Sequence, residues 1–428
     1  MTRASDSTRP LDGHIAVLGA WHLGAVAAAV FARWGRQVRV FDPDPVIRTG
    51  LEAGRPSVSE PGLAAELFEE ADRIDVTETA RDAIHGCGTV FVAFDTPVRD
   101  DGHLDPSPIF EAVEQAAEHA PPGALVLVHS QAPVGTGREI ERRLAQLGRE
   151  DLLLAETPEN LRLGTALDDF SYPGFMTVGA STEAAGRRAC SFWEDTGAEI
   201  ATCDLATAEL SKHIINSTLA TAVALGNEIS QAAHQTGADG TMATRLAKRD
   251  PRIAKMPLLP GMPFGGGNLG RDLRVLSDLL GDGSLPAAVE RSNARRLDVL
   301  TNRIQAESAP GAIAILGLTY KAGTSTLRFS MPLELAGRLV AHGHSVRAFD
   351  PQVSLDDPAL RSQPTVNVCG SLGEALDGVE TVVICVALPA FGDLDLNSLA
   401  DAGVTTVHDL AGTLVPTRGV GSPRILGP

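Results

Sequence analysis

The chain has 428 residues, a length typical of about three domains. Its 36 Lys and Arg against 54 Asp and Glu give a formal net charge of −18, and a field of that sign repels nucleic acid and acidic membrane surfaces, so neither is an expected partner. The five cysteines are scattered and odd in number, and none forms a CxxC pair, which argues against a disulfide scaffold or a metal site and fits a reducing cytoplasm.

An uncharged stretch over residues 14–32 is long enough to be mistaken for a signal peptide or a membrane helix. Gly19, His22 and Gly24 interrupt it, and it divides into a short strand-like half and an Ala-rich half. We therefore expect no membrane segment here, and we expect a cytoplasmic protein.

The predicted elements then alternate between strands and helices. A buried strand is predicted at residues 15–18, a helix at 24–34 and a second strand at 38–41, which together form a βαβ unit with parallel strands. Further strands are predicted, with helical stretches between them, at residues 90–94, 124–129 and 152–155. We expect residues 1–205 to form one doubly wound α/β domain.

The sequence changes character over residues 206–247. Apolar residues recur there at helical spacing, from Leu210 through Ile214 and Leu219 to Val223, and predict one long helix. Such a helix is too long and too apolar to stand alone. We expect it to pack in a central helical domain, residues 206–304, and against a second subunit in a homodimer.

A weak internal repeat indicates a second α/β domain. Residues 14–19 lead to a strand that ends in Phe-Asp-Pro at residues 41–43, and residues 312–317 lead to one that ends in Phe-Asp-Pro at residues 349–351. Residues 305–428 are therefore predicted to form this domain. The predicted fold class is α/β, with two Rossmann-like doubly wound domains joined by a central helical domain.

The first copy has the pattern of a dinucleotide-binding turn. Gly19 and Gly24 occupy the first and third glycine positions, and Asp42 occupies the acidic position at the end of the next strand. A carboxylate there repels a 2′-phosphate, so the expected cofactor is NAD and not NADP. Trp21 stands at the second glycine position, so the alternative is a Rossmann-like unit that binds dinucleotide poorly.

Several short motifs then follow in the order in which they occur in one known family. They are Glu-Pro-Gly-Leu at residues 60–63, Asp-Thr-Pro at 95–97, Ser-Gln-Ala-Pro-Val-Gly-Thr at 130–136, Pro-Glu-Asn-Leu-Arg at 158–162, Ala-Glu-Leu-Ser-Lys at 208–212 with Asn216, Phe-Gly-Gly at 264–266, and Leu-Gly-Leu-Thr-Tyr-Lys at 316–321 with Arg328 and Ser330. From about residue 14 to 415 the chain resembles the UDP-glucose/GDP-mannose dehydrogenases. The loop at 158–162 corresponds to that family's Pro-Glu-Phe-Leu-Arg.

This resemblance implies oxidation of a sugar alcohol to a carboxylate in two NAD-dependent steps. In the family, a Cys thiolate in the loop Phe-Gly-Gly-x-Cys-x-x-Lys-Asp captures the intermediate aldehyde, which is then oxidised to a thioester. Here Asn268 stands at the Cys position and Arg271 at the Lys position, while Asp272 is retained. A carboxamide cannot form such an adduct. Asn268 either fills the vacated space or helps to bind the carbonyl group.

Three further departures concern binding. Gln131 replaces a Thr of the family, Leu163 replaces the second Glu of its Pro-Glu-Phe-Leu-Arg-Glu loop, and Ala411 stands where the family has a nucleotide-contacting Arg. The last change weakens the expectation that the substrate carries UDP.

The remaining candidate catalytic residues suffice for interconversion of an alcohol and a carbonyl compound. Lys212 and Asn216 are four residues apart and so lie on one face of a helix. Lys212 can polarise the substrate oxygen and take its proton directly or through a water, and Asn216 can hold the same oxygen. Asp272 can orient Lys212 or the water, and Glu159 can act similarly. Lys212 and Asn216 taken alone could equally be a solvated helix face.

The resemblance also implies contacts to cofactor and substrate. Besides the turn residues Gly19, Trp21, Gly24 and Asp42, the residues assigned to NAD are His22, Leu23, Thr96, Gln131 and Arg328. Those assigned to the substrate are Leu161, Arg162, Phe264, Gly265, Gly266, Arg271, Lys321 and Arg295, the last from a neighbouring subunit. Lys321, Arg328 and Arg295 are equally plausible as surface salt-bridge residues.

Three functions remain open from the sequence. The first is a two-electron NAD-dependent oxidoreductase that acts on a CH–OH group of a sugar or nucleotide sugar and needs no thiol. The family's four-electron oxidation by a different nucleophile stays open beside it, since an aldehyde hydrate can lose a hydride directly. The second is a redox-neutral epimerase with tightly held NAD. It is suggested by Trp21, because a bulky side chain over the pyrophosphate could slow the exchange of the cofactor. The third is a catalytically inactive ligand-binding homologue, suggested by the departures at Trp21, Asn268, Leu163 and Ala411.

Overall fold

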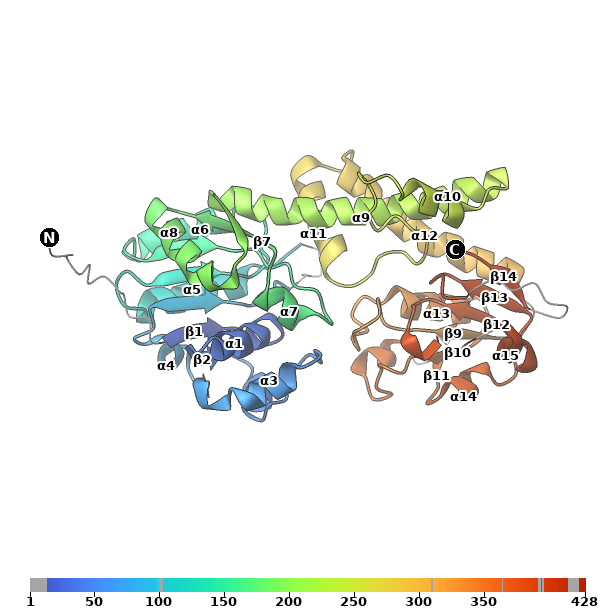
Figure 1. Cartoon of the computed structure of the whole chain (residues 1–428), viewed down its shortest axis with the longest axis horizontal. Helices are drawn as coiled ribbons and strands as arrows, with labels where there is room; N and C mark the ends of the chain where they lie inside the picture. Colours follow the sequence, from blue (N-terminus) through green and yellow to red (C-terminus); the bar gives the residue numbers. More distant parts are fainter. Residues whose placement is uncertain are drawn as a thin grey trace. The chain divides into compact units, whose positions relative to one another are not determined.

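The computed structural model describes residues 14–428 except 98, 100–102, 309–310, 364, 392–393, 395 and 415–422. The chain divides into two compact units, Met1–His213 and Ile214–Pro428. Each unit contains one sheet, and the predicted α/β fold class is confirmed (Figure 1). Within the described residues, no helix combines the length and the apolar character needed to cross a membrane.

In the described part of the first unit, eight strands form a sheet with the order β3-β2-β1-β4-β5-β6-β7-β8. The strands are β1 (His14–Leu18), β2 (Gln37–Phe41), β3 (Ile74–Val76), β4 (Thr89–Val92), β5 (Leu125–Val128), β6 (Leu153–Glu156), β7 (Phe175–Ala180) and β8 (Glu199–Cys203). The helices are α1 (Leu23–Arg33), α2 (Pro45–Glu52), α3 (Leu63–Glu69), α4 (Ala80–Ile84), α5 (Ser107–His119), α6 (Thr136–Gln146), α7 (Ala166–Ser171) and α8 (Glu183–Trp193).

The central strands of this sheet are buried on both faces. Their sequences, such as TVFV in β4 and LVLV in β5, are apolar throughout because helices cover both sides of the sheet (Figure 1). Successive side chains point to opposite faces, so Phe91 packs in one core cluster and Val90 in the other. The pairing of β6 with β7 is antiparallel, a reversal that the sequence pattern did not predict.

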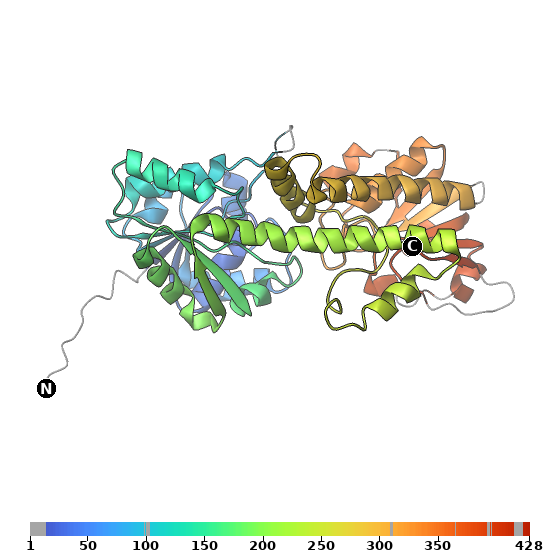
Figure 2. The same ribbon diagram turned by 90° about the horizontal axis from the view of Figure 1, so that it is seen from above.

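The long helix is shorter than predicted. α9 (Leu205–Thr236) is one unbroken helix (Figure 2), but it ends before residue 247, and α10 (Gly240–Ala247) is separate. Gly237 takes a left-handed conformation with φ of 71°, and the side chain of Asp239 caps α10 by accepting from the N–H of Met242. The expectation of one helix over residues 206–247 is therefore wrong, since apolar spacing alone does not report this break.

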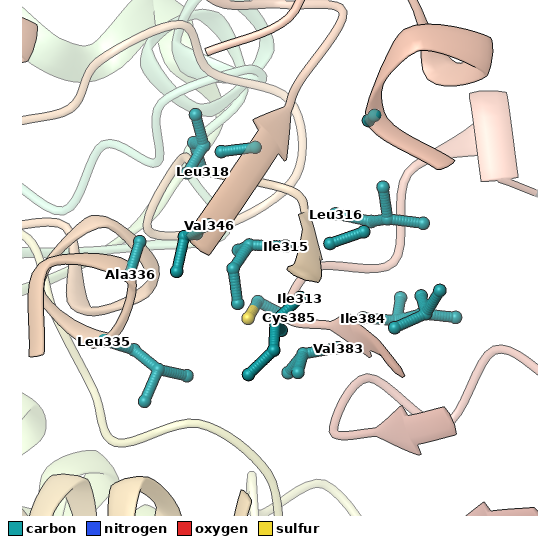
Figure 3. Packing of buried hydrophobic residues seen from close by; sticks show 14 of the residues in the cluster. Ile313, Ile315, Leu316, Leu318, Leu335, Ala336, Val346, Val383, Ile384 and Cys385 are labelled. Carbon is teal, nitrogen blue, oxygen red and sulfur yellow. The ribbon is translucent and has the colours of Figure 1, made fainter. Parts of the chain in front are cut away.

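In the described part of the second unit, six strands form a sheet with the order β11-β10-β9-β12-β13-β14, in which every pairing is parallel. The strands are β9 (Ala312–Leu316), β10 (Ser345–Phe349), β11 (Asn367–Val368), β12 (Val379–Ile384), β13 (Thr406–Asp409) and β14 (Arg424–Leu426). The helices besides α9 and α10 are α11 (Asn268–Leu280), α12 (Leu285–Glu307), α13 (Met331–Ala341), α14 (Leu372–Leu376) and α15 (Leu396–Asp401). Figure 3 shows the core of this unit, where Ile313 and Ile315 of β9 lie among side chains of β10, β12 and α13.

Candidate functional site

The predicted dinucleotide turn joins β1 to α1. Gly19 has φ of 92°, a conformation that favours glycine, and its N–H donates to the carbonyl of Phe41 at 2.8 Å. A Cβ atom at Gly24 would lie 1.7 Å from the carbonyl oxygen of Gly19. The close approach of the first turn of α1 to the loop therefore requires glycine at residue 24.

Asp42 holds this turn through its side chain. Its carboxylate is buried and accepts the N–H of Ala20 at 2.7 Å on one oxygen and that of Asp44 at 3.0 Å on the other. In the repeat, Asp350 accepts the N–H groups of Leu318 at 2.8 Å and Thr319 at 3.0 Å. Both aspartates thus fix a turn, and a ribose hydroxyl at Asp42 would share a carboxylate that already binds the backbone.

The N-terminus of α1 fits a pyrophosphate. His22 is its N-cap residue and makes no side-chain hydrogen bond to the first turn, whereas Asp44 and Thr79 cap α2 and α4 in that way. The uncapped N–H groups are the donors that an anion needs. Trp21 is 41% exposed, so the indole is not packed into the core, and Leu23 begins α1 and packs against a core cluster.

A buried carboxylate links this turn to a second loop. Glu60 lies 3.2 Å from Nε2 of His22 and accepts the N–H groups of Gly164 at 3.0 Å and Ala166 at 2.8 Å. Burial works to raise the pKa of Glu60, but the bonds from His22 and the two backbone groups outweigh it and lower this pKa. Glu60 was not among the predicted site residues, and its place in the Glu-Pro-Gly-Leu segment at residues 60–63 was the signal for this role.

Thr96 and Gln131 follow the neighbouring strands β4 and β5. Both are buried, and the hydroxyl of Thr96 donates to the backbone carbonyl of Gln131. The contact joins the carboxyl ends of two strands, which is where ligands bind in open α/β sheets.

Lys212 lies in the first unit with its side chain nearly buried. It is 5% exposed, and its Nζ donates to Oδ1 of Asn160 at 3.2 Å. In the same loop, the carboxylate of Glu159 accepts the N–H of Leu161 at 2.8 Å, so it holds its own loop. Arg162 forms an ion pair with Asp169 at 2.6 Å, which raises the pKa of Arg162, and its side chain is otherwise largely exposed.

A cavity of about 270 Å³ opens beneath this loop. Its lining residues come from the loop, from the residue after β5, from α7 and α8, and from β7 and the segment that leads into it: His129, Pro158, Asn160, Leu161, Arg162, Asp169, Phe170, Tyr172, Pro173, Gly174, Phe175, Met176, Thr177 and Trp193. Burial, together with the charge of Lys212, lowers the pKa of His129 to about 3 despite a hydrogen bond with the backbone of Thr157, which works to raise it. His129 is therefore neutral at physiological pH.

In the second unit, Asn216 and Asp272 form a buried pair. Asp272 is fully buried, and its carboxylate accepts from Nδ2 of Asn216. The structure thus places Asp272 so that it orients Asn216. Asn216 lies on α9 one turn after Lys212, and the boundary between the units falls between these two residues.

The loop Phe264-Gly265-Gly266 is held rigidly in the same unit. The N–H of Phe264 donates to Oδ1 of Asn293 at 2.9 Å, and its carbonyl accepts from Nδ2 of Asn293 at 3.0 Å. A Cβ atom at Gly265 would lie 2.6 Å from the carbonyl oxygen of Phe329, and one at Gly266 would lie 2.9 Å from the ring of Tyr320. Both glycines are required by close packing.

Asn268 is the first residue of α11, directly after this loop. It is exposed, and its Oδ1 accepts from Nη2 of Arg271 at 3.3 Å. Arg295 forms an ion pair with Glu228 at 2.9 Å.

Two further predicted binding residues of this unit lie close to aromatic rings. Nζ of Lys321 lies 5.8 Å from the ring centre of Tyr320, and the guanidinium carbon of Arg328 lies 5.4 Å from that of Phe329. The predicted site residues are therefore divided between the two units. The cofactor turn, Lys212 and the loop 158–162 belong to the first unit.

Comparison with known proteins gives matches along most of the chain. The NAD binding domain of the UDP-glucose/GDP-mannose dehydrogenase family matches residues 13–196, the central domain matches 206–295, and the UDP binding domain matches 314–414. The UDP-glucose 6-dehydrogenase of Rickettsia bellii is 28% identical over 395 residues, which are 89% of this chain and 91% of that protein.

Two solved structures have a similar fold. A UDP-glucose dehydrogenase from Pyrobaculum islandicum superposes with a TM-score of 0.83 at 27% identity, covering 96% of this chain and 98% of its own. A UDP-D-ManNAc dehydrogenase from Pyrococcus horikoshii superposes with a TM-score of 0.86 at 26% identity, covering 97% and 98%.

Proposed function

Because this chain belongs to the UDP-glucose/GDP-mannose dehydrogenase family and is an NAD-dependent dehydrogenase, we propose that it interconverts an alcohol and a carbonyl compound in one two-electron step on a nucleotide sugar or a related sugar or nucleoside. The observation that carries this proposal is Asn268 at the first position of α11, where the family has its cysteine. An amide cannot form the thiohemiacetal on which the second oxidation depends.

The cofactor supplies the redox chemistry, since bound NAD accepts a hydride from the carbinol carbon. The uncapped N-terminus of α1 and the glycine turn fit its pyrophosphate. The chain itself has to hold the substrate oxygen and move its proton. In oxidation a base of the chain would take the hydroxyl proton, and in reduction the same group would return it.

Lys212 is the proposed proton carrier. Its amine is shielded from water and held by Asn160 at 3.2 Å, so it is confined to a small volume. Neutral Nζ takes the hydroxyl proton, and charged Nζ stabilises negative charge on the oxygen or returns the proton. Asn216 is proposed to hold the same substrate oxygen by a hydrogen bond, because Asp272 fixes the orientation of the Asn216 amide.

The substrate class rests on the relatives. The third family segment is a UDP binding domain, and the similar proteins act on UDP-linked sugars by their names. The binding roles given above to the other residues are part of this proposal. Nothing in the site favours the epimerase or the inactive homologue specifically, so both are outcomes of the test.

Product analysis under single-turnover conditions tests the proposal. With a panel of nucleotide sugars, free sugars and nucleosides, we expect one NADH and one carbonyl product per substrate oxidised. Two NADH and a carboxylate would contradict it. Turnover without added NAD by enzyme that copurifies with it would indicate the epimerase, and no NAD binding at millimolar cofactor would indicate the inactive homologue.

The variant Asn268→Cys sharpens the test. A thiol at the first position of α11 gains nucleophilicity from the helix N-terminus. We expect it to be trapped as a covalent adduct with the carbonyl product, detected by mass spectrometry, while the control Asn268→Ala forms none. Equal product patterns and no adduct in both variants would argue against residue 268 as the position that limits the reaction to two electrons.

We also propose a homodimer in the cytoplasm. Large apolar side chains of α9 and α10 are between 41% and 54% exposed: Ile214, Ile215, Leu225, Met242 and Leu246. Such a surface suits a second copy of the chain. All five cysteines are free, which suits a reducing compartment. Light scattering after gel filtration tests the dimer, and a monomer at micromolar concentration would contradict it.

A further inference from the structure

We propose that Glu209 and His213 are positioning residues, which hold the segment 131–137 against the turn of α9 that carries Lys212. This segment follows β5 and runs into the first residues of α6. The inference rests on the proposed function for the role of Lys212, but its evidence is separate. It consists of buried hydrogen bonds within the first unit.

Glu209, Lys212 and His213 lie on one face of α9. Lys212 and His213 follow Glu209 by three and four residues, which is the spacing of neighbours on the surface of a helix. All three side chains are polar and buried, with exposed fractions of 3%, 5% and 0%. Lys212 contacts Asn160, whereas the other two contact the segment 131–137. Burial of polar side chains is unfavourable without such partners.

Glu209 caps α6 from a position far away in the sequence. The N-cap residue of α6 is Gly135, which has φ of 102° and no side chain that could cap the helix. The carboxylate of Glu209 accepts the N–H of Gly135 at 2.6 Å and that of Gly137 at 2.7 Å. In contrast, α8 is capped by its own N-cap residue Thr182. A local cap satisfies backbone donors equally well, but only a cap from α9 also joins α6 to the helix of Lys212.

His213 holds the beginning of the same segment. Its Nε2 lies 3.0 Å from the carbonyl oxygen of Ala132, and Nε2 is therefore the donor, because a carbonyl oxygen only accepts. The preceding residue is Gln131, a proposed NAD contact, whose carbonyl accepts from the hydroxyl of Thr96. The segment is thus attached to α9 both at its beginning and at its end.

These contacts place a proposed cofactor contact and the proposed proton carrier on one support. If α9 shifts relative to the segment 131–137, the distance between Lys212 and the Gln131 backbone changes. A misplacement of about 1 Å in a reacting pair lowers a rate by about 10²-fold. We therefore expect the loss of either contact to weaken NAD binding and to slow the reaction of bound substrate.

His213 gives the sharper test, because a glutamine side chain can place an N–H donor near the position of the histidine Nε2. We expect His213→Leu to bind NAD about fivefold more weakly by calorimetry, and His213→Gln to remain within about twofold of the wild type. The second readout is NADH formation at saturating NAD with the compound of the panel that reacts fastest. We expect kcat to fall at least about tenfold in His213→Leu and to recover in His213→Gln, while the KM for this compound changes less than about threefold.

Glu209→Gln tests the second contact. Its amide has one accepting oxygen instead of two, and its NH₂ group faces a backbone N–H donor. We expect the same decreases in NAD affinity and kcat. The control is Thr182→Ala, which removes the cap of α8 in the same unit without touching α9. It should leave both quantities unchanged, and urea denaturation verifies that every variant is folded under the assay conditions.

The outcomes separate this inference from the proposed function. An unchanged kcat at saturating NAD in folded His213→Leu and Glu209→Gln would overturn the link to Lys212. Equal losses in His213→Leu and His213→Gln, or a similar loss in Thr182→Ala, would show a general effect on folding and overturn it as well. If no compound yields NADH, NAD affinity decides. Weaker binding in His213→Leu that is restored in His213→Gln would then support the positioning of the segment and contradict the dehydrogenase reaction, and unchanged affinity would overturn both.

Discussion

Replacing Glu60 by alanine should both destabilise the first unit and weaken cofactor binding. This carboxylate joins the dinucleotide turn, through His22 at 3.2 Å, to the loop that leads into α7, through the N–H groups of Gly164 and Ala166. The variant removes the acceptor and leaves two backbone donors in a buried place. It deletes no part of the cofactor turn itself.

The magnitude follows from these contacts. Each unpaired buried N–H costs about 1–3 kcal/mol, so the pair and the lost bond to His22 together lower the free energy of unfolding by about 3–5 kcal/mol at pH 7. Because the pKa of Glu60 is lowered on folding, its contribution is present above the pKa of the unfolded chain, near 4.5, and is lost as pH falls through the folded value. The difference in the free energy of unfolding between the variant and the wild type should therefore become smaller at acidic pH.

Urea denaturation at pH 7 and pH 4, followed by circular dichroism, measures this difference. NAD titration at pH 7 should show at least tenfold weaker binding, since His22 at the N-cap of α1 loses its support. Glu69→Ala is the matched control, because Glu69 is an exposed residue at the end of α3. A loss below 1 kcal/mol, or the same loss at both pH values, would refute the role assigned to Glu60.

Two further predictions concern other buried titratable residues. Lys212→Met should lower kcat by about 10²–10⁴-fold and leave NAD affinity unchanged. Steady-state kinetics and calorimetry measure both quantities, with the exposed Lys255→Met as the control, and a decrease in kcat of tenfold or less would contradict a role of Lys212 in proton transfer. Glu156→Gln should stabilise the protein by about 1–3 kcal/mol at pH 8 and by less at pH 5. Burial and the nearby Glu209 raise the pKa of Glu156 in the folded protein, so the wild type loses stability as pH rises from about 4.5 through that raised pKa, whereas the variant does not. Thermal unfolding at both pH values checks this, and a destabilised variant at pH 8 would count against it.

The sequence was sufficient to predict the central strands, the first helix and the internal repeat. Buried parallel strands have continuous apolar sequences, and glycine turns have a fixed spacing. The predicted strand at residues 38–41 lies in β2, and residues 312–317 of the repeat begin with β9. The break at Gly237 could not be predicted from apolar periodicity, which continues on both sides of it. The antiparallel pairing of β6 with β7 depends on contacts far apart in sequence.

The candidate site was predictable in its residue types but not in their partners. Asp42 was expected to face a ribose, and the structure shows both of its oxygens on the turn backbone. Asp272 was expected to orient Lys212 or a water; the structure shows that its carboxylate accepts from Asn216 and that Lys212 donates to Asn160. A motif gives the residues that the chemistry needs, but side-chain pairing is decided by packing in three dimensions.

The two Phe-Asp-Pro repeats show what makes one turn suitable for a cofactor. In both, a glycine N–H donates to the carbonyl of the Phe at the end of the next strand, Gly19 to Phe41 at 2.8 Å and Gly317 to Phe349 at 2.9 Å, and the aspartate after that Phe holds the turn. The helices differ. Ser330 caps α13 by accepting the N–H of Leu333 at 3.1 Å, so a side chain already satisfies that N-terminus. The N-terminus of α1 has no such cap and follows its turn after three residues, so its N–H groups remain available to a phosphate. The two turns therefore share the aspartate and differ in whether a side chain caps the helix that follows.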